Sequence, residues 1–262
     1  MTASVAFLLV VLGFLAGVFG ALAGLGGGII LIPVLTIYFG LPIHQAIGIS
    51  LLSVIATSTA TSSQYVERHV TDIRLGMTLE LATTLGALIA ALVAQRMDRR
   101  TLAVLFVCFL TYSAASLVKK AWSSRQQAHE TMVPDYKTQN YPFGLGASLI
   151  AGGLSGLLGI GGGPINVPVM YLFMKGPLRV ATATSNFMIG ATAATSAYIY
   201  WGRGDINVPL AAPLVAGVFA GSLLGARLAP KVKAFYILLL LIAVMGWLAV
   251  RMLYKLATGG FQ

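Results

Sequence analysis

The stretch Gly24-Leu-Gly-Gly-Gly28 interrupts a long apolar run, and it recurs 135 residues later as Gly159-Ile-Gly-Gly-Gly163. Glycine is a poor helix former, at about 1 kcal/mol per residue relative to alanine. Apolar segments flank both stretches. The sequence therefore predicts two places where one helix stops and another begins, and we call them the first glycine break (24–28) and the second glycine break (159–163).

The composition around the breaks is typical of a membrane protein. The chain has 262 residues, of which 58% are hydrophobic and 9% are charged, and its mean hydropathy is +0.88. Soluble domains carry about 25% charged residues. In lipid, helices satisfy their own backbone hydrogen bonds. We therefore expect an all-α polytopic membrane protein, and the N-terminus reads as its first membrane helix.

Apolar segments fill most of the chain and predict eight to ten membrane segments. The two that follow the breaks, 28–40 and 163–174, are too short to cross a hydrocarbon core of roughly 30 Å, so we expect half-helices there. The other segments are 4–23, 43–65, 74–95, 101–118, 143–158, 178–201, 206–229 and 234–254.

The spacing of 135 residues also matches positions outside the breaks, which indicates an internal duplication of a kind common in transporters. We expect a first transmembrane repeat (1–118), a polar linker (119–142) and a second transmembrane repeat (143–262). The matched pairs include Pro33 and Pro168, Ser50 and Ser185, and Thr57 and Thr192.

The basic residues favour inverted over parallel repeats. An odd number of crossings per repeat places 11 of the 17 Lys and Arg residues on one side, whereas an even number divides them almost equally. Because basic loops stay in the cytoplasm, we expect a cytoplasmic linker, external termini and a multi-pass protein of the plasma membrane. The net charge of +10 then reflects loops that meet lipid and attract anions, and not binding of nucleic acid.

The breaks themselves predict an anion site. Helices that begin inside the membrane point free N–H groups and a partial positive charge at one spot, and glycine lets a solute approach the backbone. Asn166 lies in the first turn after the second break, where the first half has Leu31. The alternative is that the glycines only permit close helix packing, as we expect for the small residues of 13–24 and 152–159. The predicted donors here are Gly26, Gly27, Gly28, Gly161, Gly162, Gly163 and Asn166.

A stripe of hydroxyl groups follows each break at helical spacing. Its members Ser53 and Thr57 belong to segment 43–65, and Ser185, Asn186 and Thr192 belong to segment 178–201. Hydroxyls and amides can donate hydrogen bonds to an oxyanion. They can equally bond the carbonyl four residues earlier or a neighbouring helix, and the sequence favours neither interpretation.

Three ionisable residues are candidates for a role in transport. Glu80 lies about two turns into segment 74–95, and intramembrane carboxylates often carry protons; alternatively it pairs with Arg74 or a loop base near the interface. His44 and Arg179 occupy matched positions at the starts of their segments, where they could line an entrance or anchor the helices at the interface.

Catalytic and metal-binding patterns are missing from the sequence. It has no intramembrane pair of carboxylates, no His/Cys spacing for a metal, no plausible Ser-His-Asp set and no nucleotide-binding loop. We therefore expect neither an enzyme nor a bound cofactor.

The duplicated motifs, with Pro33 and Pro168 downstream and the stretches Ala46-Ile-Gly-Ile-Ser and Ala181-Thr-Ala-Thr-Ser, resemble the sulfite exporter TauE/SafE family over essentially the whole chain. The resemblance implies a secondary transporter of sulfur-containing anions, such as sulfite, thiosulfate, sulfoacetate or other organosulfonates. It would use alternating access, with H⁺ or Na⁺ as a candidate coupling ion, and about eight spans. The alternatives are an anion channel, a transporter of a non-sulfur organic anion, and a membrane-embedded enzyme or assembly factor.

Overall fold

The computed structural model describes residues 3–24, 26–126, 138–229 and 234–258, and every regular element within them is a helix. Five helices are long and apolar enough to cross a membrane. The predicted all-α polytopic fold is therefore confirmed. The five are α1 (Ala3–Ala23), α3 (Ile43–Glu67), α4 (Ile73–Ala94), α6 (Tyr141–Leu158) and α9 (Val208–Leu228).

The remaining helices include the two predicted half-helices, each of which begins at the last glycine of its break. They are α2 (Gly28–Tyr38) and α7 (Gly163–Pro168), with α5 (Arg99–Gln126), α8 (Leu178–Gly202) and α10 (Ala234–Ala257). The second half-helix continues as a π-helix, η1 (Val169–Phe173), whereas the matched α2 stays α-helical. Residues 119–126 of the predicted linker are helical because α5 runs on to Gln126, and 127–137 lie outside the described residues.

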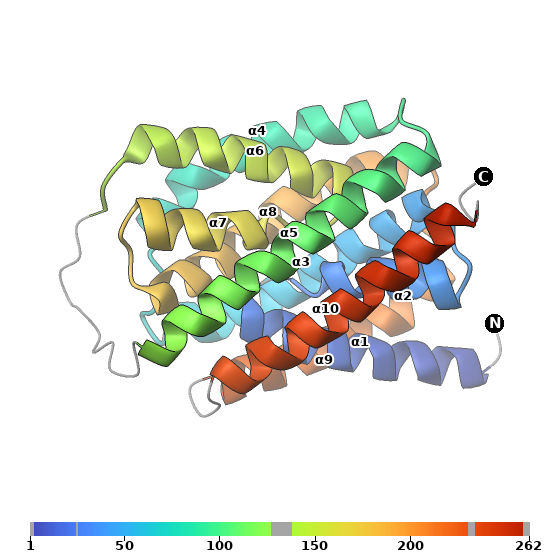
Figure 1. The fold of residues 1–262 in the computed structure, drawn as a ribbon, viewed down its shortest axis with the longest axis horizontal. Coiled ribbons are helices and arrows are strands. Elements are labelled where there is room, and N and C mark those ends of the chain that lie inside the picture. The colour runs from blue at the N-terminus through green and yellow to red at the C-terminus, as the bar shows by residue number, and fades with distance from the viewer. Residues whose placement is uncertain (1–2, 25, 127–137, 230–233, 259–262) are drawn as a thin grey trace.

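The helices form one elongated bundle with both ends of the chain at the same end of it (Figure 1). The C-terminal end of α5 and the start of α6 lie at the opposite end (Figure 1). The hairpin of α1 and α2 opens toward the end with the termini, and the hairpin of α6 and α7 opens the other way (Figure 1). This placement is what inverted repeats require, although the repeat relationship itself stays a prediction.

Helices of the first half pack mainly against helices of the second half. Helix α1 packs against α9, α6 packs against α4, and α3 and α8 pack together between these pairs. Small residues allow the close approach, because a Cβ at any of four glycines would lie 1.9–2.3 Å from a carbonyl oxygen of the facing helix. The packing role predicted for these glycines is therefore confirmed. They are Gly13 and Gly17 on α1, and Gly152 and Gly156 on α6.

Candidate functional site at the glycine breaks

The two breaks reverse the chain with the same backbone conformation. Three glycines in each have φ between +67° and +80°, a region that residues with side chains rarely adopt. Any other residue would be strained there, so the two reversals need glycine at these points. The six are Gly24, Gly26 and Gly27 in the first break and Gly159, Gly161 and Gly162 in the second.

The breaks lie against each other between α3 and α8. Ser50 on α3 donates a 2.7 Å hydrogen bond from its Oγ to the Gly159 carbonyl. A Cβ on Gly28 would lie 2.5 Å from that Oγ and 2.7 Å from the same carbonyl. Val54 and its matched residue Ile189 each contact both breaks, at Gly26 and at Gly161. The structure thus brings the predicted break residues to one place.

Hydroxyl groups near the first break form hydrogen bonds with other atoms of the protein. The Oγ atoms of Ser53 and Thr57 donate to carbonyls four residues earlier, each at 3.1 Å. Thr57 lies 3.9 Å from the Cβ position of Gly27, and Ser222 on α9 donates to its hydroxyl at 3.1 Å. Ser222 also bonds the Gly17 carbonyl at 3.2 Å. On this side of the site the hydroxyl stripe serves helix packing.

The second half is different, because several of its buried polar atoms have no hydrogen-bond partner within the part of the chain that the structure describes. The Oδ1 of Asn166 is one of them, and its Nδ2 lies 3.5 Å from the Cβ position of Gly162. Asn186 donates to the Thr182 carbonyl through Nδ2, at 3.2 Å, and leaves its Oδ1 unpaired. Apart from atoms of the Arg203–Asp205 pair, the other unpaired atoms of the second half are the Oγ atoms of Ser148 and Ser155 on α6 and of Ser185 on α8.

Ser185 matches Ser50, but the other unpaired groups have no polar match in the first half. Positions equivalent to Ser148, Ser155, Asn166 and Asn186 in the first half hold apolar residues. Within the described residues, the buried hydroxyl and amide groups that lack a hydrogen-bond partner near the breaks are therefore mostly those of the second break. The four first-half residues are Gly13, Gly20, Leu31 and Leu51.

Glu80 lies among threonines and not beside a base. Its Oε1 accepts hydrogen bonds from Thr192 on α8, at 2.8 Å, and from Thr84, at 2.9 Å, while its Oε2 accepts one from Thr83 at 3.1 Å. Within the described residues, the pairing with Arg74 that the sequence allowed is not formed, and the hydrogen-bond partners of the carboxylate are these threonines. Thr192, predicted to contact the substrate, thus belongs to the surroundings of this carboxylate.

His44 and Arg179, which the sequence predicts to line an entrance or to anchor their helices at the interface, lie apart. They begin α3 and α8, which start at opposite ends of the bundle (Figure 1). His44 lies within electrostatic reach of Arg203 and Asp205, and its Nε2 is buried without a partner. Arg179 is exposed, and it lies within electrostatic reach of Tyr65 near the end of α3.

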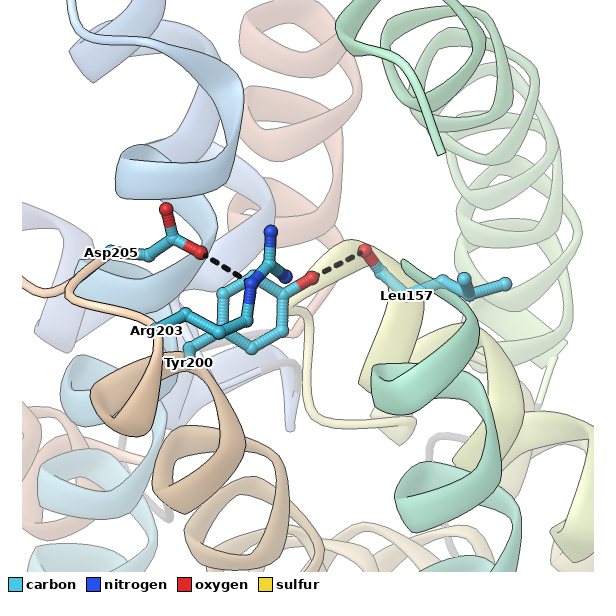
Figure 2. A network of polar contacts seen from close by, with 4 residues as sticks. All are labelled: Leu157, Tyr200, Arg203 and Asp205. Carbon is cyan, nitrogen blue, oxygen red and sulfur yellow. Dashed lines mark hydrogen bonds and ion pairs between the residues drawn. The ribbon is translucent and has the colours of Figure 1, made fainter. Parts of the chain in front are cut away.

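Arg203 is held near the end of α8 by two contacts (Figure 2). Its Nε lies 3.1 Å from the Asp205 carboxylate, and its guanidinium lies 5.2 Å from the centre of the Tyr200 ring. The Tyr200 hydroxyl points to the Leu157 carbonyl, 3.4 Å away, just before the second break (Figure 2). This cluster ties the end of α8 to the end of α6.

Several site residues were not expected from the sequence. Ser222 and Ser155 were hidden in stripes of small residues that also favour plain packing. Thr83 and Thr84 follow Glu80 at the helical spacing of three and four residues, and that spacing was the available signal. Val54 and Ile189, which contact both breaks, have apolar side chains that gave no signal of a site.

Metal ligands do not gather anywhere in the described part of the chain, since no group of three His, Cys, Asp or Glu residues there could hold an ion.

The sequence was compared with known protein families and with known proteins. Residues 9–252 match the model of the family described as Sulfite exporter TauE/SafE. The chain belongs to the TauE/SafE family. It is 30% identical to the probable membrane transporter protein YunE of Bacillus subtilis, over 95% of this chain and 97% of that one. It is 29% identical to the probable membrane transporter protein MJ0441 of Methanocaldococcus jannaschii, over 94% of each chain. No solved structure matches.

The family and the long apolar helices together make this TauE/SafE protein a multi-pass membrane transporter.

Proposed function

We propose that this TauE/SafE protein is a secondary transporter of small sulfur-containing oxyanions, such as sulfite, thiosulfate, sulfoacetate or other organosulfonates, in the plasma membrane. The observation that carries the proposal is the set of unpaired, buried polar groups at the second glycine break. Ser155, Asn166 and Ser185 are each at most 2% exposed, and unpaired buried polar atoms are rare unless they serve a purpose.

The chemistry of this shell suits an oxyanion. Serine hydroxyls can donate to it, as can the backbone N–H groups at the start of a helix. None of the break residues is a Lys or Arg, so an anion held there is bound by dipoles and hydrogen bonds. A transporter has to release its substrate, and such neutral donors release an anion more readily than a buried guanidinium would.

The difference between the two breaks supports a substrate with two unlike ends. Asn166 stands beside the second break where Leu31 stands beside the first, and both are buried. A sulfonate group would face the polar side around Asn166, and a short carbon chain would face Val54 and Ile189 between the breaks.

The arrangement of the two hairpins supports a mechanism of alternating access. The hairpins of α1 with α2 and of α6 with α7 open toward opposite ends of the bundle (Figure 1), and their breaks meet at its centre. Movement of one hairpin against α3 and α8 would expose the meeting point to one side, and movement of the other hairpin would expose it to the other side.

Reconstitution of the purified protein in liposomes tests this function. We expect saturable counterflow of labelled sulfite, thiosulfate or a short sulfonate, and a thermal stabilisation by the same compounds in detergent. Failure of every sulfur oxyanion in both assays would refute the substrate class, and unitary currents in planar bilayers would indicate a channel instead.

The variant Asn166→Leu, which copies the first break into the second, tests the site. It removes the hydrogen bond that the Asn166 Nδ2 would donate to an anion, worth about 1.5–3 kcal/mol, so we expect roughly 10- to 150-fold weaker binding. Thr195→Val is the matched control, because Thr195 lies on α8 with a half-buried side chain whose hydroxyl bonds the Ala191 carbonyl of its own helix. Equal affinity in both variants would place the anion elsewhere.

A further inference from the structure

The carboxylate of Glu80 has an unusual set of neighbours for a charged group inside a membrane protein. Three threonine hydroxyls surround it, two from its own helix α4 and one, that of Thr192, from α8. The hydroxyl of Thr192 also lies 3.2 Å from that of Thr83, and the hydroxyl of Thr84 joins them through the shared carboxylate. The second half has no counterpart, because the residue matched to Glu80 is Val215.

No positive charge faces this carboxylate from the helices that pack on α4, which are α6 and α8. Helix α6 has no charged residue, and its one titratable side chain is that of Tyr141 at its start. The charged residues of α8 are Arg179 near its start and Arg203 just past its end, and α4 itself adds Arg74 in its first turn. Within the described residues, no hydrogen bond or ion pair joins any of these groups to Glu80.

An ionised carboxylate without a partner ion is costly in a low-dielectric environment, and such a group tends to be neutralised. A threonine hydroxyl can either donate or accept a hydrogen bond, depending on how it rotates. Donating, the three hydroxyls stabilise the carboxylate; accepting, one of them receives the proton of the carboxylic acid. The same cluster therefore accommodates both protonation states without movement of the backbone.

The cluster also contacts the elements that carry the substrate site. Thr192 belongs to α8, which contributes Ser185 and Asn186. The Thr83 carbonyl lies against α6, since a Cβ on Gly152 would be only 1.9 Å from it. Helix α6 leads directly into the second break. A change of charge at Glu80 thus acts on the contact between α4 and α8 beside that break.

We propose that Glu80, with the hydroxyls of Thr83, Thr84 and Thr192, is the site at which a transported proton binds, so that the sulfur oxyanion moves together with H⁺. This inference rests on the proposed function. In each cycle one proton adds to a carboxylate oxygen of Glu80 when the site faces one side, and the same O–H bond breaks when it faces the other. Joint movement removes one negative charge from the transported load.

Uptake by proteoliposomes tests the coupling. We expect an imposed pH gradient to drive accumulation of a labelled sulfonate, and an imposed Na⁺ gradient to have no effect. In Glu80→Gln the driven accumulation is lost and the remaining exchange becomes independent of pH. Glu67→Gln is the matched control, because Glu67 is exposed at the end of α3, and it should behave as the wild type.

Variants of Thr192 test the proton site even if Glu80→Gln does not fold. Thr192→Ser keeps the hydroxyl and should keep the coupling, whereas Thr192→Val removes it and should change the pH dependence of exchange. Uptake driven by Na⁺ and not by H⁺ would overturn the proposal, as would wild-type pH dependence in Glu80→Gln.

A measurement without substrate separates this inference from the proposed function. Infrared difference spectra between acidic and basic pH should contain a carboxylic acid C=O band that the wild type and Glu67→Gln share and that Glu80→Gln lacks. If that band is present but no sulfur oxyanion is transported, the proposed substrate fails and the proton site stands. If all three proteins give the same spectrum, the proton site is refuted.

Discussion

The variant Gly28→Ala tests whether the two breaks need to touch. Gly28 is the first residue of α2 and has no positive φ, so alanine is compatible with its backbone. Its methyl group would lie 2.7 Å from the Gly159 carbonyl and 2.5 Å from the Ser50 Oγ. Ordinary contacts of this kind begin at 3.4 Å, and the carbonyl belongs to the backbone, so the breaks must move apart.

The expected cost has two parts. Overpacking of a tight site costs about 1–3 kcal/mol, and weakening the hydrogen bond from Ser50 to Gly159 adds about 0.5–1.5 kcal/mol. We therefore expect a loss of roughly 2–4 kcal/mol in the free energy of unfolding. Substrate affinity should fall as well, because the predicted anion site is built at this contact.

Gly146→Ala is the matched control for this experiment. Gly146 lies inside α6, has no positive φ, and has nothing within 4 Å of its Cβ position. Alanine there should be neutral or stabilise the helix by up to about 1 kcal/mol. Steric-trapping measurements in bicelles give both free energies of unfolding. If the two variants were equally stable and bound substrate equally, the close contact between the breaks would be refuted.

Two other predictions concern the surroundings of the site. Ser222→Ala loses hydrogen bonds to the Gly17 carbonyl and to the Thr57 hydroxyl, so we expect the free energy of unfolding to fall by about 0.5–1.5 kcal/mol. In a double-mutant cycle, its effect should not add to that of Thr57→Val. Arg203→Gln breaks a partly exposed ion pair with Asp205, so the unfolding free energy should change by about 1 kcal/mol or less, and a larger loss in the same assay would show that the cluster has a structural role.

The sequence predicted the helices well because their signals are local. Apolar length and the triple glycines set the starts of α2 and α7 at Gly28 and Gly163, and the structure has both. The π-helix after Pro168 was not predicted. Proline lacks an N–H group and disturbs the hydrogen bonds of the preceding turn, but the matched Pro33 lies inside a regular α-helix, so proline alone does not distinguish the two halves.

Side-chain partners across helices were harder to predict. Glu80 could have paired with Arg74, one and a half turns away, and only the packing of α8 on α4 shows that Thr192 reaches it instead. For His44 and Arg179, the sequence left an entrance and interfacial anchoring as alternatives, and which role each residue has stays a prediction. Inverted repeats place such positions at opposite ends, so their match is an argument against a shared entrance.

The exchange of helices between the halves also constrains how the protein is made. Residues 3–23 leave the ribosome first, yet α9, the helix that covers their glycine face, spans residues 208–228. Synthesis proceeds from the N-terminus. Helix α1 is therefore inserted into the bilayer before α9 has been made, and it lacks this packing partner until most of the chain has been inserted. Two separately expressed fragments, 1–126 and 138–262, should therefore be short-lived alone and should stabilise each other when they are made in the same cell.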